Sequence, residues 1–366
     1  MTTTETTLFT PHSLRGLQLR NRMIRSATLE GMCEANGEPT AALIDLYQQL
    51  AAGGCGLLIS GITYVSDDGK LMPTGLGASS DSQLDGLTTL AETVHQAGGT
   101  FCVQLGHSGG QGYSQVCGGQ TLAPSALELA QYPAVPQEMT LADIEIKVAA
   151  FAAAAGRAKQ AGCDAVQLHA AHGYLINQFL SPLTNQRQDG YGGDLAGRSR
   201  FLLEIVSAIQ QSVGIDYPLL VKLNGSDNLD GGLEIDESVA VAKMLDAAGI
   251  AAIEISSGTP GSGDDNPIRL NHESGSEMAY NAVLSRVIKQ QVTCPVIVVG
   301  GIRSLHVATG LLRTHQADYV SLSRPLIREP DLPNKLQSGA SEKATCISCN
   351  GCLKALMKGQ IRCVIP

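Results

Sequence analysis

The chain has 366 residues, of which 43% are hydrophobic and 16% charged, and its formal net charge is −9. A chain of this length and composition can bury a large core, and α/β barrels reach this length as one domain. The 25 Lys and Arg residues form no basic cluster, so we expect no nucleic-acid partner. The N-terminus "MTTTETTLFTPHS" lacks a basic segment followed by an apolar one, and no apolar run reaches about 18 residues. We therefore expect a cytoplasmic protein with no membrane partner.

Short apolar runs alternate with segments of helical periodicity along the whole chain. The apolar runs are "RMIRSAT", "CGLLISG", "FCVQLG", "DAVQLH", "PLLVKLN", "AAIEISS", "PVIVVG" and "DYVSLS". The helical segments are "TAALIDLYQQLAAGG", "DSQLDGLTTLAETVHQAGG", "LADIEIKVAAFAAAAGRAKQAG", "RSRFLLEIVSAIQQSV", "DESVAVAKMLDAAG" and "SLHVATGLLRTHQ". Strands that are apolar almost throughout, and that alternate with helices, indicate a parallel sheet with helices on its outer face.

This alternation predicts an α/β fold, a single (β/α)8 (TIM) barrel. An open doubly wound sheet is the alternative, but no G-x-G-x-x-G follows the first strand, so a separate dinucleotide-binding domain is not indicated. We assign residues 1–340 to the barrel and residues 341–366 to a C-terminal tail that contains cysteines. Catalytic groups of such barrels gather at the C-terminal ends of the strands.

Polar residues occur where several of the predicted strands end. The first strand runs into Ser26, and the third ends in "VQLGHSGGQ", which contains Gln104 and His107. Lys222 lies inside the apolar run "PLLVKLN" of the fifth strand. Its ammonium group must find an anion or a polar ligand that offsets the cost of desolvation.

The fourth strand leads into "VQLHAAHGYLINQFLSP", in which His169, His172 and Tyr174 lie within six positions. Two imidazoles can each donate an N–H to an oxygen that gains negative charge, and a tyrosine hydroxyl can deliver a proton. A purely structural role is the alternative for a single histidine, but three such groups at one strand end favour catalysis. We expect no metal here, because the segment offers no third ligand.

The last two predicted strands both pass through small residues into a helix start. The seventh ends in "VVGGIRS" and the eighth in "SLSRPLI". Backbone N–H groups of Gly300, Gly301, Ser323 and Arg324 would cradle a phosphate, as barrels commonly do at this position. We therefore expect a phosphate-bearing cofactor whose ring lies across the barrel mouth.

Taken together, these segments resemble the old yellow enzyme family of FMN-dependent NAD(P)H:flavin oxidoreductases, the ene-reductases. The segments that carry the resemblance are "NRMIRSATLEGM", "LISGITYVSDDGK", "VQLGHSGGQ", "LHAAHGYLINQFLSPLTNQRQDGYGGDLAGRSRF", "VKLNGSDN", "VVGGIRS" and "SRPLIREPDLPNK". The resemblance covers nearly the whole chain. It implies an FMN over the barrel top that NAD(P)H reduces, and that then reduces an alkene conjugated to a carbonyl or nitro group.

The resemblance also implies a role for each residue at the strand ends. His169 and His172 would bind the electron-withdrawing oxygen of the substrate, and Tyr174 would protonate the α-carbon. Gln104 would bond the pyrimidine edge of the flavin. Lys222 takes a position that Arg usually holds, near N1 and the C2 carbonyl, and would stabilise the charge of the reduced flavin.

The first two strand ends complete the implied flavin site. Ser26, Ala27 and Thr28 would face the flavin near its C4 carbonyl and N5, and Gly61 would be a further cofactor contact. Thr28 places the chain among family members that carry Thr, where others carry Cys.

The tail contains a C-x2-C-x2-C-x10-C pattern that is formed by Cys346, Cys349, Cys352 and Cys363. Such clustering in a cytosolic protein suggests a metal or an iron–sulfur cluster. The pattern resembles that of the multidomain branch with dienoyl-CoA reductase and trimethylamine dehydrogenase, where a [4Fe–4S] cluster has the spacing C-x2-C-x3-C-x11-C. The last two gaps here are each one residue shorter, so we expect a structural tail and no functional cluster.

The leading hypothesis is thus an FMN-dependent NAD(P)H oxidoreductase that reduces activated C=C bonds of small molecules, with a homo-oligomer possible. Three alternatives remain open. One is an iron–sulfur enzyme like dienoyl-CoA reductase, and another is a phosphate-binding barrel lyase that uses Lys222 as a Schiff-base nucleophile. The third is a redox-sensing or metal-storage protein that acts through the C-terminal cysteines.

Overall fold

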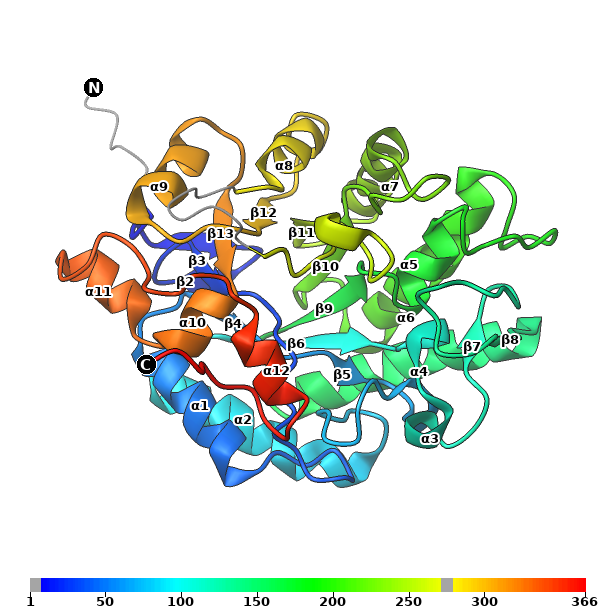
Figure 1. The fold of residues 1–366 in the computed structure, drawn as a ribbon, viewed down its shortest axis with the longest axis horizontal. Coiled ribbons are helices and arrows are strands. Elements are labelled where there is room, and N and C mark those ends of the chain that lie inside the picture. The colour runs from blue at the N-terminus through cyan, green and yellow to red at the C-terminus, as the bar shows by residue number, and fades with distance from the viewer. Residues whose placement is uncertain (1–7, 271–278) are drawn as a thin grey trace.

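The computed structural model describes residues 8–270 and 279–366, and a closed parallel barrel lies at its centre (Figure 1). Its strands are β3 (Met23–Arg25), β4 (Leu57–Ile59), β6 (Phe101–Gly106), β9 (Ala165–Ala170), β10 (Leu219–Asn224), β11 (Ala252–Ser256), β12 (Val296–Val299) and β13 (Tyr319–Leu322). Each strand pairs in parallel with the next, and pairings of β13 with β3 and of β4 with β6 close the ring. The predicted (β/α)8 barrel is confirmed.

Helices connect these strands and form the outer layer of the molecule (Figure 1). The connecting helices are α1 (Ala41–Ala52), α2 (Leu84–Gln96), α4 (Leu141–Gln160), α6 (Leu195–Val213), α7 (Ile235–Ala247), α8 (Ala282–Lys289) and α9 (Leu305–Arg313). Thr40, Thr140, Asp194 and Ser304 cap the N-termini of α1, α4, α6 and α9 with their side chains. Each cap accepts a hydrogen bond from a backbone N–H that has no partner inside its helix.

Shorter helices and strands lie in the segments before, between and after these elements. They are β1 (His12–Leu14), β2 (Leu17–Leu19), β5 (Thr63–Tyr64), α3 (Ser114–Cys117), β7 (Leu122–Ala123), β8 (Gln137–Glu138), α5 (Leu175–Leu180), α10 (Arg324–Arg328), α11 (Leu332–Ser338) and α12 (Gly351–Leu356). Helix α12 belongs to the cysteine-containing tail and lies inside the ring of outer helices, beside α10 (Figure 1). Within the described ranges, no helix is both long and apolar enough to cross a membrane.

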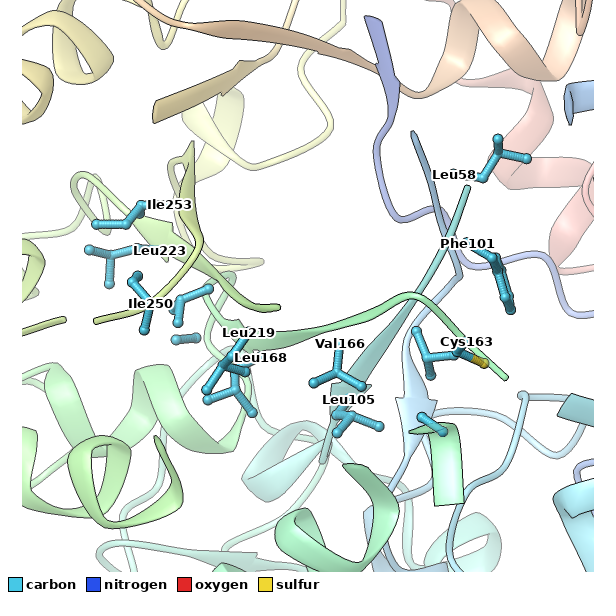
Figure 2. Close-up of a cluster of buried hydrophobic side chains, with 14 of the residues drawn as sticks. Leu58, Phe101, Leu105, Cys163, Val166, Leu168, Leu219, Leu223, Ile250 and Ile253 are labelled. Atoms are coloured by element: carbon cyan, nitrogen blue, oxygen red, sulfur yellow. The ribbon is translucent and has the colours of Figure 1, made fainter. Parts of the chain in front are cut away.

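Two apolar layers hold the barrel together because side chains alternate between its faces along each strand. The outer layer packs the strands against the helices. Figure 2 shows part of it, with Leu58, Phe101, Leu105, Cys163, Val166, Leu168, Leu219, Leu223, Ile250 and Ile253.

The inner layer fills the N-terminal end of the barrel. It includes Leu57, Ile297 and Tyr319, all fully buried. Leu14 and Leu19 of the antiparallel β1–β2 hairpin belong to the same cluster, so the hairpin plugs this end. The opposite end of the interior is polar, and the candidate site lies there.

Candidate active site

A cavity of about 510 Å³ opens at the C-terminal end of the barrel, within the size range of small-molecule sites. It brings together every predicted site residue except Gly61. Those lining it are Ser26, Ala27, Thr28, Gln104, His169, His172, Tyr174, Lys222, Gly300, Gly301, Ser323 and Arg324. They come from strands far apart in the sequence, and the barrel geometry places them around one opening.

Gly61 and His107 lie elsewhere. Gly61 donates its N–H to the Tyr47 hydroxyl over 3.2 Å, and a Cβ at this position would meet the Glu30 carboxylate. His107 has its Nε2 3.3 Å from the Asp68 carboxylate and its Nδ1 accepts from the Gly109 N–H. Neither residue lines the cavity, so His107 is part of a polar cluster beside the barrel.

His169, His172 and Tyr174 form one wall of the cavity. The His169 ring centroid lies 5.0 Å from that of His172 and 4.7 Å from that of Tyr174, with edge-to-face packing in both pairs. His169 is buried, whereas the other two are partly open to the cavity. The three polar groups that the sequence placed at one strand end therefore do converge.

The loop after β9 has an unusual backbone that other buried groups hold in place. His172 has φ +61°, in the left-handed region that non-glycine residues rarely adopt. Its N–H donates to Asn224 Oδ1 over 3.2 Å, and its carbonyl accepts from Gln111 Nε2 over 2.8 Å. Asn224 in turn donates to the Asp227 carboxylate over 2.9 Å. The strained position is thus fixed by hydrogen bonds from several segments.

The electrostatics of the wall favour neutral imidazoles and a protonated phenol. Burial lowers the pKa of His169 well below its ordinary value, and the nearby Lys222 lowers it further. Burial lowers the pKa of His172 well below the ordinary value too, with His169 and Lys222 adding to the effect. Burial raises the pKa of Tyr174 to about 12. At neutral pH all three side chains can therefore donate a hydrogen bond.

Lys222 lies at the floor of the cavity, where it contacts both a polar side chain and an anion, the two kinds of partner that the sequence allowed for it. Lys222 Nζ donates to Ser26 Oγ over 2.9 Å and lies 3.6 Å from Glu254 Oε2. Glu254, on β11, is fully buried. These contacts offset the desolvation of the ammonium group. They also engage the amine that a Schiff-base nucleophile would have to keep free.

The opposite wall is built from the ends of β12 and β13. Gly300 and Gly301 have φ +118° and +71°, and a Cβ on Gly300 would strike the Tyr280 ring. Ser323 Oγ lies 2.7 Å from Thr28 Oγ1. The backbone N–H groups of Gly300, Gly301, Ser323 and Arg324 donate no hydrogen bond to any residue in the described ranges. They are therefore available to an anion, as the sequence predicted.

Arg324 and Arg303 bring positive charge to this wall. Arg324 Nη1 donates to the Arg269 carbonyl over 2.7 Å and to Asn350 Oδ1 over 2.5 Å, which ties it to the C-terminal tail. Arg303 lines the same cavity and donates to the Cys346 carbonyl over 3.2 Å. The sequence reasoning missed Arg303, although it lies only two positions after Gly301.

Glu254 and Ser256 were missed as well. Ser256 Oγ lies 2.7 Å from His172 Nε2 and so orients that ring. Both belong to the apolar run "AAIEISS". An acidic residue inside such a run is the same signal that singled out Lys222, and it could have been used.

The four tail cysteines line one small cavity, which Arg324 and Arg328 also border. Cys349 Sγ accepts from the Gly351 N–H, and Cys363 Sγ accepts from Arg328, both over 3.4 Å. In the part of the chain that the structure describes, no group of three or more His, Cys, Asp or Glu side chains could hold a metal ion.

Several polar atoms around the main cavity make no hydrogen bond within the described residues, and they fit a flavin that carries a phosphate. His169 Nδ1 and Ser321 Oγ are buried without a hydrogen bond within the described residues. The Gln104 side-chain oxygen makes none to these residues either, while the amide nitrogen is bonded. A flat heterocycle with polar edges would use these atoms, and a phosphate would use the free N–H groups opposite. The fold and the site thus define a (β/α)8-barrel oxidoreductase of the FMN-binding class.

Comparisons with known proteins agree. The model of the NADH:flavin oxidoreductase / NADH oxidase family matches residues 7–343. "NADH oxidase" of Thermoanaerobacter brockii is 35% identical over 98% of this chain and 55% of its own length. "NADPH dehydrogenase" of a Geobacillus species is 37% identical over 94% of this chain and 96% of its own length. The chain thus spans about half the length of some curated relatives and nearly all of others.

Solved structures give the same result. A complex of 2-naphthoyl-CoA reductase matches with a TM-score of 0.91 and 28% identity, over 99% of this chain and 57% of that one. The old yellow enzyme homologue from Zymomonas mobilis matches with a TM-score of 0.80 and 28% identity, over 94% and 96%. The chain belongs to the NADH:flavin oxidoreductase / NADH oxidase family, which is the old yellow enzyme family.

Proposed function

We propose that the protein is an FMN-dependent NAD(P)H oxidoreductase that reduces the C=C bond of small α,β-unsaturated carbonyl or nitro compounds. The observation that supports this most directly is the wall of His169, His172 and Tyr174, three proton-bearing groups beside a floor that carries Lys222. FMN, when bound, would supply the hydride that it takes from NAD(P)H.

The two imidazoles would bind the carbonyl or nitro oxygen. Because burial keeps His169 and His172 neutral, each can donate one N–H without a competing positive charge. The Ser256 hydroxyl engages His172 Nε2, while Nδ1 makes no hydrogen bond within the described residues. Donors held in place beforehand stabilise the charge that develops on the oxygen as the β-carbon is reduced.

Tyr174 would deliver the proton to the α-carbon. Its raised pKa, about 12, keeps the hydroxyl protonated throughout the neutral range. The ring packs edge-on against His169, so the acid lies next to the group that binds the oxygen. General acid catalysis needs this proximity to the reacting atom.

At the far end, Gly300, Gly301, Ser323 and Arg324 would bind the FMN phosphate. Ser26, Ala27, Thr28 and Gln104 would contact the flavin ring. Gly61 does not line the cavity, so it would support these residues without contacting the ring. We assign this chemistry to residues 1–340 and a wall-forming role to residues 341–366. We also propose a cytoplasmic location and a small electron-poor alkene as the substrate.

The test is anaerobic mixing of FMN-loaded protein with NADPH or NADH, followed by 2-cyclohexenone. The flavin absorbance should bleach with at least one nucleotide and return when the enone is added. A His169→Ala/His172→Ala variant should bleach but recover slowly. A flavin that stays oxidised with both nucleotides would reject the proposal.

A second candidate is a CoA-thioester reductase with an iron–sulfur cluster. The similarity to the 2-naphthoyl-CoA reductase structure supports it. The four cysteines line one cavity next to Arg324, but in the described residues their side chains are not grouped as metal ligands, so a cluster would require them to move together. Iron and acid-labile sulfide in anaerobically purified protein would support it. A spectrum with flavin bands alone, and no bound iron, would reject it.

A further inference from the structure

A chain of buried polar side chains lies below the cavity floor. Gln104 Nε2 donates to Gln167 Oε1 over 2.7 Å, and Gln167 Nε2 donates to Glu254 Oε2 over 3.0 Å. Ser26 Oγ donates to Glu254 Oε1 over 2.7 Å and accepts from Lys222 over 2.9 Å. Gln104, Ser26 and Lys222 line the cavity, whereas Gln167 and Glu254 do not. Glu254 therefore supports three floor residues from beneath.

The Glu254 carboxylate determines which group donates and which accepts at each hydrogen bond in this series. It can only accept hydrogen bonds, so Gln167 must turn its NH2 group toward Glu254. The Gln167 oxygen then faces Gln104 and takes a hydrogen from the Gln104 NH2 group. This leaves the Gln104 oxygen as an acceptor at the floor. It is the group that the imide N–H of a flavin pyrimidine ring requires.

The carboxylate also balances the charge of the floor. Lys222 lies 3.6 Å from Glu254, and both side chains are almost completely buried. At such a distance and burial, two opposite charges interact strongly and are little screened by salt. A lone Lys222 would strongly stabilise the negative charge that a flavin gains on two-electron reduction. With Glu254 below it, the net charge of the floor is close to zero.

We propose that Glu254 is a positioning residue that acts on FMN through Lys222 and Gln104, and that it lowers the reduction potential of the bound flavin. This inference rests on FMN binding in the proposed function. A lower potential makes the reduced flavin a stronger hydride donor toward the alkene. Charge close to the flavin is one of the main ways in which a protein tunes this cofactor.

The test is the potential of FMN in the Glu254→Gln variant, measured by anaerobic titration against a reference dye. The variant keeps the size of the side chain but removes its charge. The equilibrium between oxidised and reduced flavin should shift at least tenfold toward the reduced form, about 30 mV for a two-electron couple. An unchanged or lower potential with FMN bound would overturn the proposal.

Two controls separate this effect from a general change in charge. Asp318→Asn alters the protein charge equally, but Asp318 pairs with Lys289 over 2.7 Å just before β13, at the plugged end. That variant should leave the potential unchanged. In a Lys222→Met background the buried carboxylate of Glu254 has lost its ion-pair partner and should be neutral, so Glu254→Gln should shift the potential much less than in the wild type. An equal shift in both backgrounds would contradict action through Lys222.

Gln167→Met keeps the inference testable if Glu254→Gln fails to fold. It cuts the link to Gln104 but leaves the ion pair intact. FMN should bind about tenfold more weakly to the apoprotein, as one hydrogen bond to the ring is lost. The equilibrium between oxidised and reduced flavin should stay within a few-fold of that in the wild type. An unchanged affinity for FMN would show that Gln167 does not orient the Gln104 amide. If the wild-type protein binds no FMN at all, the proposed function itself fails.

Discussion

The two ends of the barrel interior are built by the same strands, but one end is filled by apolar side chains and the other by polar and charged ones. At the plugged end, Leu57, Ile297 and Tyr319 pack with the β1–β2 hairpin in an apolar cluster. At the open end, Lys222 and Glu254 form a buried ion pair, and above it lie polar atoms that make no hydrogen bond to any residue the structure describes. Apolar burial stabilises the fold, whereas burying charge costs free energy unless each group is paired. The residues at the start of the strands therefore mainly stabilise the fold, whereas those at the end line the candidate site.

The variant Tyr174→Phe should have the largest effect of the changes considered, and this effect should be on catalysis at the open end. Losing the proposed general acid should slow alkene reduction by about 10²–10⁴-fold, because phenylalanine has no hydroxyl proton to deliver. Flavin reduction by NAD(P)H should be unchanged, and so should the melting temperature. Rapid-mixing experiments on the two half-reactions would measure this. Equal slowing of both half-reactions would show that Tyr174 has a role other than proton delivery.

The variant Leu57→Ala should destabilise the plugged end of the barrel without changing the catalytic rate. Leu57 is fully buried in the apolar cluster. Its truncation should lower the free energy of unfolding by about 2–5 kcal/mol. Turnover per folded molecule should be unchanged, as measured by urea unfolding beside steady-state assays. A loss of turnover in fully folded protein would contradict the separation of the two ends.

The smallest expected effect is on the pH dependence of stability. The folded-state pKa values of His169 and His172 are lowered from the ordinary 6.5. The unfolded chain therefore binds protons below about pH 6.5 that the folded chain refuses, and stability should fall as the pH drops. Each histidine adds at most about 1.4 kcal/mol per pH unit. The variant His169→Asn/His172→Asn should show a shallower loss between pH 6.5 and pH 5 in urea titrations, and an identical slope would refute the assignment.

The sequence predicted the fold because its signals are local and repeated. Each of the eight apolar runs contains a barrel strand, and all six proposed helical segments form helices. The missed elements depend on contacts that only the folded chain provides. Helix α12 has six residues and starts after Asn350 in the left-handed region. The plugging hairpin consists of two strands of three residues, which is too short to show periodicity.

Much of the site also followed from the sequence, since barrel strand ends must meet at one opening. The requirement that Lys222 find an anion or a polar ligand was confirmed, but these partners could not be identified from spacing. Lys222 and Glu254 are 32 positions apart, and only the parallel register of β10 and β11 makes them direct neighbours. The two strands are joined through helix α7 and not by a tight turn, so the spacing along the chain does not fix which residues face each other.

The hairpin that plugs one end of the barrel has a kinetic consequence. In the proposed reaction, nucleotide and alkene would both reach the cavity through the opposite mouth, and both would use the same face of the flavin above Lys222. They would therefore take turns, with the first product leaving before the second reactant enters. Initial-rate plots at several fixed concentrations of one reactant should then be parallel lines, and an excess of either reactant should slow the enzyme by occupying the place of the other.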